Sequence, residues 1–165
     1  MKILFIFILI MLFSLTCFSQ EKPQVEIIEA SRTRSCGFIS GIYDSFVQGT
    51  PIEKNVIIVS YKGKNESKAN IAERRLHNAK IYFTEYYKNT RFSRPENTII
   101  TTLGVGESKE GKLDFYVDGN LRLTLLFLDN IDFHVSPCYL DLKDYCEDEM
   151  KKLFYPCYKP ENSPK

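Results

Sequence analysis

The sequence predicts an α+β fold, a two-layer sandwich with the order strand, helix, strand, helix, strand, strand, strand and a C-terminal helix. The first observation is a long stretch with helical periodicity, residues 67–89, between two short apolar runs at 55–60 and 97–102. The second is the pair Asp118-Gly119 between two alternating stretches, which is typical of a hairpin whose type I′ turn needs positive φ at both residues.

The N-terminal half supplies the first strand and a first, shorter helix. Residues 24–30 form the first predicted strand. From 37 to 47, apolar side chains recur at helical spacing and predict an amphipathic helix, which Gly-Thr-Pro at 49–51 should end. The next strand, 55–60, has consecutive apolar residues at its centre, which is typical of a strand that is buried on both faces.

The main helix is predicted over 67–89, with Ser67 as its N-cap. Its apolar residues alternate at steps of four and three, so they lie on one stripe that can cover a sheet. That stripe consists of Ala72, Leu76, Ala79, Phe83 and Tyr86. The hairpin strands follow at 112–117 and 121–127, and a last helix is predicted over about 140–154. Its apolar stripe consists of Leu142, Cys146, Met150 and Leu153.

The N-terminus has the layout of a secretory signal peptide. Lys2 precedes an apolar run from 3 to 15, and a small residue, Ser19, marks the expected cleavage site. The uncharged stretch is short for a membrane anchor, and nothing resembling a stop-transfer segment follows it. Cys17 offers a lipoprotein alternative, but the residues before it match the lipoprotein context poorly, so ordinary cleavage is favoured.

The chain is therefore divided into a signal peptide (1–19), an α+β domain (20–135) and a cysteine-containing C-terminal helix and tail (136–165). Cleavage removes Lys2 from the 22 lysines and arginines, which leaves 21 against 21 acidic residues. A neutral chain is unlike nucleic-acid or polybasic membrane-surface binders, which concentrate Lys and Arg on one face. We expect a periplasmic or secreted location, no nucleic-acid partner and no stable membrane span after cleavage.

Four cysteines remain after this cleavage: Cys36, Cys138, Cys146 and Cys157. An even number in an exported chain indicates two disulfides, with three possible pairings. A zinc site is the competing interpretation, but the sequence has no Cys-x-x-Cys. The last predicted helix would separate Cys138 from Cys157 by roughly 20 Å, which is too far for one disulfide. We therefore favour Cys36–Cys138 and Cys146–Cys157.

Several short segments along residues 25–127 share an order and spacing with a known family. They are Ile71-Ala72, Arg75-Leu76, Tyr82-Phe83, Gly104-Val105-Gly106-Glu107 and Asn120-Leu121-Arg122-Leu123. Together they resemble the OmpA-like domain, with its Asn-x-x-Leu-Ser-x-x-Arg-Ala helix, Gly-Tyr-Gly-Glu turn and Asn-Arg-Arg-Val strand. The resemblance implies strand, helix, strand, helix, strand, strand order and binding of peptidoglycan through the carboxylate of its cross-linking diamino acid.

The resemblance also implies that Arg75 is a carboxylate ligand, since a guanidinium grips a carboxylate in bidentate fashion. The alternative is that Arg75 is a solvated helix-surface residue beside Arg74. In the family an Asp at the exit of the second strand takes the ammonium. Here Ser60 or Tyr61 falls at that position, and the Gly-His-Thr-Asp signature is missing.

The loop before the main helix carries Lys62 and Lys64, with Lys68 close by. Cations around a helix N-terminus can form an anion pocket with the free N–H groups. The alternative is an ordinary solvated basic loop. Arg122, in the strand that resembles Asn-Arg-Arg-Val, completes the candidate ligand-binding set of Arg75, Lys62, Lys64 and Arg122.

We expect a non-enzymatic binding module of the cell envelope, with peptidoglycan or a partner protein as its ligand and with no cofactor or metal. The alternatives are a small secreted hydrolase, whose site is assembled from distant residues, and a structural remnant without a ligand. An acidic and a basic side chain converging beside the main helix would favour binding. A deep pocket that holds His77 or His134 beside a hydroxyl would favour catalysis.

Overall fold

The structure is a computed structural model, which describes residues 24–30, 38–67, 69–106 and 108–128. The expected signal peptide, the four cysteines of the expected mature chain and the expected C-terminal helix lie outside these residues. Within the described ranges, no helix is both long enough and apolar enough to cross a membrane.

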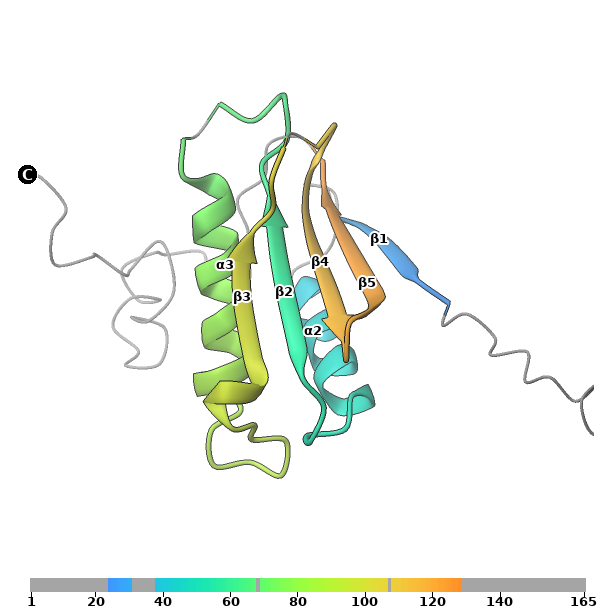
Figure 1. Ribbon diagram of the computed structural model, residues 1–165, viewed down its shortest axis with the longest axis vertical. Helices are drawn as coiled ribbons and strands as arrows, with labels where there is room; N and C mark the ends of the chain where they lie inside the picture. Colours follow the sequence, from blue (N-terminus) through green and yellow to red (C-terminus); the bar gives the residue numbers. More distant parts are fainter. Residues whose placement is uncertain (1–23, 31–37, 68, 107, 129–165) are drawn as a thin grey trace, which may run out of the picture.

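The fold is α+β, a five-stranded mixed sheet with two helices (Figure 1). The observed order, β-α-β-α-β-β-β, confirms the predicted order of these elements. They are β1 (Glu26–Ala30), α2 (Phe38–Gly49), β2 (Val56–Tyr61), α3 (Ile71–Ile81), β3 (Ile99–Leu103), β4 (Gly111–Val117) and β5 (Asn120–Phe127).

The strands lie side by side in the order β1-β5-β4-β2-β3. β2 runs parallel to β3 and antiparallel to β4, while β1 runs parallel to β5 at the other edge. β4 and β5 form the predicted hairpin. Its turn residues have the expected positive φ values, 48° for Asp118 and 80° for Gly119. The first strand therefore pairs with the last one, and β2 occupies the position between β3 and β4.

Both helices pack against the same face of the sheet. The ring of Phe115 in β4 lies 5.6 Å from Tyr43 of α2 and 5.9 Å from Phe83, which follows α3. Along β2, buried side chains alternate with half-buried ones, beginning with buried Val56. The expectation that this strand is buried on both faces is therefore wrong, because the described helices cover only one face.

The opposite face of the sheet carries apolar side chains around a polar centre. Ile27 of β1 is 65% exposed there and Ile100 of β3 is 51% exposed. At the centre, buried Asp114 accepts hydrogen bonds from Thr124 Oγ1 at 2.7 Å and from Lys112 Nζ at 2.5 Å. Two donors satisfy a carboxylate that would otherwise be costly to bury.

The main helix begins later than the sequence predicts. α3 starts at Ile71 after Asn70, and Asn70 makes no capping hydrogen bond through its side chain. The prediction of Ser67 as the N-cap is therefore wrong. Just upstream, the side chain of Glu66 turns inward to pair with Arg75, and residues 69 and 70 form a turn before the helix begins.

The end of the main helix is wider than an α-helix. Residues Tyr82–Tyr86 form a π-helical segment, whose hydrogen bonds span five residues instead of four. The wider turn shifts the phase of the buried stripe, so Tyr87 is buried and Tyr86 is 49% exposed. The prediction that Tyr86 belongs to the buried stripe is therefore wrong. Asn89, with a φ of 66°, adopts the left-handed conformation that Asn tolerates better than most residues.

Candidate functional site

The structure separates the four candidate ligand-binding residues between opposite ends of the sheet. Arg75 lies with its guanidinium carbon 4.0 Å from the ring centre of Phe127, at the end of β5. Lys62 and Lys64 belong to the loop at this same end. Arg122 lies five residues before Phe127 along β5, or about 17 Å away. The fold thus brings Arg75 together with the loop lysines, and it does not bring Arg122 to them.

Arg75 is completely buried and forms an ion pair with Glu66. The other oxygen of this carboxylate, Oε2, accepts the backbone N–H of Gly63 at 2.8 Å. One face of the guanidinium stacks on the ring of Phe127, a cation–π contact. Arg75 therefore holds a carboxylate as the resemblance implies, but the carboxylate belongs to the same chain.

Two glycines give the ion pair its space. A Cβ atom on Gly111 would lie 2.2 Å from Arg75 Nη1 and 2.3 Å from Glu66 Oε1. A Cβ atom on Gly63 would lie 2.4 Å from the backbone nitrogen of Gly111. Such separations are too short for any real side chain, so the buried pair requires glycine at both positions.

The loop that carries the lysines is tied to the loop before β4. The N–H of Lys64 donates to the carbonyl of Ser108 at 3.0 Å, and the N–H of Ser108 donates to the carbonyl of Lys62 at 3.3 Å. The N–H of Glu66 donates to the carbonyl of Gly63 at 3.1 Å, which closes a turn. These backbone bonds fix the loop on which Glu66 enters the interior.

A cavity of about 390 Å³ opens beside the Glu66–Arg75 pair. We call it the loop-end pocket; it is lined by Asn65, Glu66, Lys109, Glu110, Gly111, Phe127 and Leu128. Lys62, Lys64 and Lys109 are exposed at this end of the protein. Glu66 and Arg75 thus converge beside the main helix, where they form a buried ion pair within the chain.

The sequence reasoning missed Glu66 and Phe127 as neighbours of Arg75. One signal was available for Glu66. Since the family's acidic position falls at Ser60 or Tyr61, the nearest downstream acid is the natural partner for the arginine. For Phe127 there was no such signal, because its contact with Arg75 depends on where β5 lies in the sheet.

The histidines do not form a catalytic arrangement that the structure can assign. His77 is half-buried on α3 and does not line the loop-end pocket, while His134 lies outside the described residues. Among the residues described, no group of three or more His, Cys, Asp or Glu side chains could hold a metal ion.

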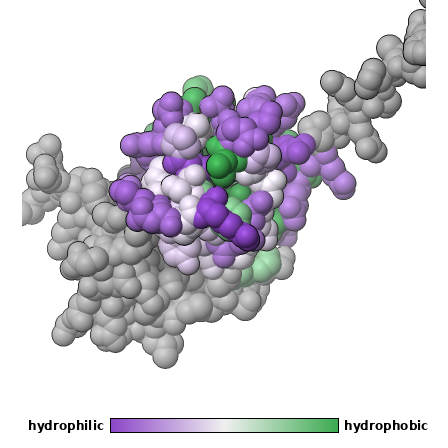
Figure 2. Space-filling model, turned by 90° about the horizontal axis from the view of Figure 1, so that it is seen from below, coloured by the Kyte–Doolittle hydropathy of each residue, from purple (hydrophilic) through white to green (hydrophobic). Residues whose placement is uncertain are grey.

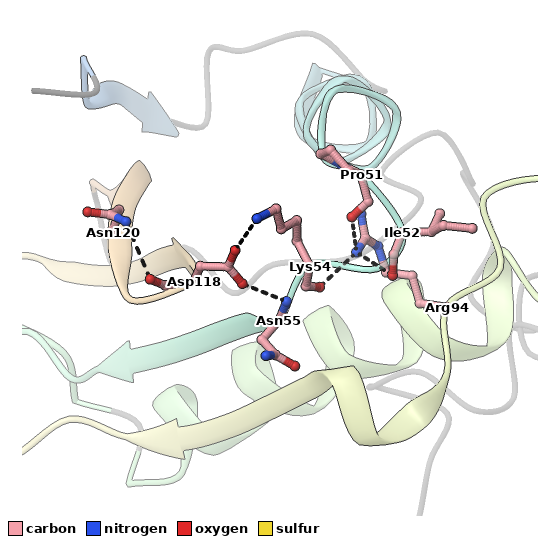
Figure 3. A network of polar contacts seen from close by, with 7 residues as sticks. All are labelled: Pro51, Ile52, Lys54, Asn55, Arg94, Asp118 and Asn120. Atoms are coloured by element: carbon pink, nitrogen blue, oxygen red, sulfur yellow. Dashed lines mark hydrogen bonds and ion pairs between the residues drawn. The ribbon is translucent and has the colours of Figure 1, made fainter. Parts of the chain in front are cut away.

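The opposite end of the molecule, shown from below in Figure 2, is largely hydrophilic around a small hydrophobic patch. Here Arg94 holds the loop between α2 and β2 through backbone carbonyls (Figure 3). Its Nη1 donates to the carbonyls of Pro51 at 3.0 Å, Lys54 at 3.3 Å and Ile52 at 3.4 Å, and its Nη2 donates to Thr50. Arg94 is thus a structural clamp on this loop.

The hairpin turn is fastened to the start of β2 at the same end (Figure 3). Asp118 Oδ1 accepts the N–H of Asn55 at 3.1 Å, and Oδ2 pairs with Lys54 Nζ at 2.6 Å. The hydrogen bond from Lys54 lowers the pKa of Asp118, and the same bond raises the pKa of Lys54.

Arg122 lies at a second cavity, of about 620 Å³, between α2 and the β1–β5 side of the sheet. We call it the α2 groove. It is lined by Glu26, Ile28, Phe38, Gly41, Ile42, Ser45, Phe46, Gly49, Thr50, Pro51, Val117, Arg122 and Leu123. Arg122 is exposed there, on an otherwise mainly apolar lining.

A cluster of tyrosines joins α2 to the end of the main helix. Asp44 Oδ1 accepts hydrogen bonds from the hydroxyls of Tyr82, at 2.5 Å, and Tyr87. Burial, and next the hydrogen bond to Asp44, raises the pKa of both tyrosines above the ordinary range. Burial also raises the pKa of Tyr43 in the neighbouring core. The hydroxyls of Tyr82 and Tyr87 act as neutral donors that connect the end of the main helix to α2.

Comparisons of the chain with family models, with curated proteins and with solved structures found no match. The likeness to OmpA-like domains therefore rests on the short segments quoted from the sequence, and its functional part is taken up below as a proposal.

Proposed function

We propose that this protein is an exported, non-enzymatic binding module of the cell envelope with an OmpA-like architecture, and that its ligand is a partner protein. The ligand site is the loop-end pocket with the loop around it. The α+β order of elements is compatible with this family, and the convergence of Glu66 and Arg75 beside α3 supports a binding role.

The observation that carries the proposal is the internal engagement of Arg75. Peptidoglycan binding in the manner of the family needs an arginine that is open to the carboxylate of the ligand. Here Arg75 is buried, and Glu66 supplies a carboxylate that is also fixed by Gly63. A ligand carboxylate would have to displace this internal one, and breaking a buried ion pair is costly. This favours a partner protein over peptidoglycan.

The exposed residues of the same end suit a protein surface. Lys109 lines the loop-end pocket together with Asn65, Glu110 and half-buried Leu128, and Lys62 and Lys64 are exposed in the loop at the same end. Cationic side chains at the rim of an interface steer an acidic partner and set its orientation, while a central apolar contact adds affinity. The partner expected here carries acidic side chains around an apolar one.

Sedimentation with purified cell-wall sacculi separates the two ligands. The mature wild-type protein should stay in the supernatant. Tight retention that Arg75→Ala abolishes, with unchanged circular dichroism, would instead establish peptidoglycan. Adding the free cross-linking diamino acid gives the same answer without a variant, because it should release any protein that sacculi retain through this residue.

Charge reversal tests the partner surface. Lys62→Glu with Lys109→Glu should weaken the complex with an envelope partner by about tenfold or more. The matched control is Lys88→Glu with Arg91→Glu, exposed residues between the main helix and β3, at the end of the sheet opposite to Lys62 and Lys109. Both double variants change the net charge by the same amount, so equal weakening by the two would contradict the proposed site.

A further inference from the structure

The α2 groove is a second feature, independent of the loop-end pocket. Its volume of about 620 Å³ and its apolar residues, among them Ile42, Phe46 and Leu123, fit the apolar stripe of an amphipathic helix. Gly41 opens one wall, since a Cβ atom there would meet nothing within 4 Å. Large exposed apolar patches on single domains mark sites that bind another protein surface, a membrane or a ligand.

We propose that residues 140–154 of the same chain dock in the α2 groove as an amphipathic helix. The sequence predicts a helix there, with an apolar stripe that begins at Leu142 and ends at Leu153. These two residues are 11 positions apart, so the stripe would be about 16 Å long. α2 has 12 residues and a length of about 18 Å. The stripe therefore matches the groove along which it would lie.

The connection is long enough for this docking. The chain leaves the sheet at Leu128, whose N–H donates to the carbonyl of Ala30 at 2.9 Å. Twelve residues later it reaches 140, and that many residues span up to about 40 Å. The whole of β5, with 8 residues, is about 27 Å long. The segment can thus reach any part of the groove from its own sheet.

The position of one cation in the groove bears on how this segment would dock. The groove lining carries two exposed charged residues, the cation Arg122 and the carboxylate Glu26. The first part of the segment is strongly acidic, with Asp141, Asp144, Glu147, Asp148 and Glu149. Carboxylates next to the apolar stripe would face Arg122 when the stripe enters the groove, and such complementarity fixes the register of a docked helix.

The favoured disulfide agrees with the same placement. Cys36 precedes Phe38, a residue of the groove, by two positions, and Cys138 precedes residue 140 by two positions. A Cys36–Cys138 bond would bring the start of the segment next to the start of α2 and raise its effective concentration at the groove.

Hydrogen exchange tests the proposal. It is measured on the full mature chain and on a variant in which a bulky side chain fills the groove. Gly41→Trp places a bulky side chain at the open wall, and Trp has a higher helix propensity than Gly. Exchange in residues 140–154 should quicken by about tenfold or more, while exchange in β4 and β5 stays unchanged. The control, Thr102→Trp on exposed β3, should leave residues 140–154 protected. Unchanged exchange in Gly41→Trp, equal quickening in the control, or an unprotected wild-type segment would overturn the proposal.

Photo-crosslinking gives a second answer, in case Gly41→Trp disturbs the core. A benzophenone side chain at Ser45, which is exposed and lines the groove, should crosslink to residues 140–154 within one chain. Arg122→Glu in the same protein should reduce the yield severalfold, whereas Arg91→Glu should not. Crosslinks to a second copy of the chain, or to other segments only, would show that something else occupies the groove.

Discussion

Arg75 engages a carboxylate and an aromatic ring entirely within its own chain. Its guanidinium binds a carboxylate and an aromatic ring, as a ligand-binding arginine would, but both partners come from its own chain. The backbone of Gly111 lies close against the pair, and Gly63 lies close against Gly111. At this site a cation that was expected at the surface holds the loop of Glu66 to the end of the sheet.

Arg75→Met should therefore destabilise the protein strongly, by about 3–5 kcal/mol, because it leaves the carboxylate of Glu66 buried without its cation. Urea denaturation at neutral pH measures this. Combining Arg75→Met with Glu66→Met should recover much of the loss, since it removes the buried charge too. The exposed pair Lys88–Glu85 is the matched control, and Lys88→Met should cost less than about 0.5 kcal/mol. Equal effects of the two single substitutions would contradict a structural role for Arg75.

Gly111→Ala and Gly49→Ala should change stability in opposite directions. The first introduces a methyl group 2.2 Å from Arg75 Nη1 and should cost about 1–3 kcal/mol through overpacking. The second adds a methyl group that meets nothing within 4 Å, in a helix, and should add up to about 1 kcal/mol. Thermal unfolding of the two variants beside the wild type makes the comparison, and a stable Gly111→Ala would show that the ion pair is looser than its geometry indicates.

At the scale of the helices and strands, local sequence patterns predict some features of the structure correctly and others wrongly. The Asp118-Gly119 turn was predicted with its positive φ values, because the residue types alone specify that turn. The stripe of the main helix was predicted correctly through Phe83, whereas Tyr86 was misplaced. A π-helical turn changes the helical period only where packing demands it, so a pattern that assumes a constant period loses the phase there.

Asp118→Asn isolates the charge that fastens the hairpin to β2. Asn keeps the turn conformation and removes the ion pair with Lys54, so the urea midpoint should fall at neutral pH. Because the pKa of Asp118 is lowered in the folded protein, its contribution is present above the unfolded pKa of about 3.9 and disappears as the pH falls through the lower folded value.

The difference between Asp118→Asn and the wild type should therefore vanish in acid. Lys54→Met should give no further loss when it is added to Asp118→Asn. An undiminished difference at low pH would assign the effect to the turn instead of the ion pair.

At the scale of the whole molecule, the buried tyrosines predict that the free energy of unfolding decreases at alkaline pH. Burial raises the pKa of Tyr43, Tyr82 and Tyr87 in the folded protein. These tyrosines should not change stability below a pH of about 10, where unfolded tyrosines begin to ionise. Above that pH stability should fall, because the unfolded chain loses protons that the folded chain retains. For fully buried Tyr43 the slope is about 1.4 kcal/mol per pH unit.

Urea denaturation at increasing pH, together with tyrosinate absorbance, tests this behaviour. Tyr82→Phe should make the alkaline loss of stability less steep, because it removes one of the groups with a raised pKa. Full ionisation of the tyrosines in the folded protein near pH 10 would contradict the buried cluster.

The class and the order of the elements could be predicted from the sequence because each depends on local periodicity. The order of the strands in the sheet could not be predicted in this way. β1 pairs with β5, and the local sequence of neither strand indicates which other strand it pairs with. The candidate site was predicted only in part for the same reason. Arg75 was singled out by a local motif, whereas Phe127 and Gly111 reach it through the sheet.

The pairing of the first strand with the last one has a consequence for the timing of folding. Glu26 lies opposite Leu123, 97 positions further along the chain. While the chain is being made, β1 has no partner until nearly all of the domain has emerged, and closing so long a loop is slow. A polypeptide with this arrangement therefore cannot complete its sheet before residues 120–127 are available to pair with β1.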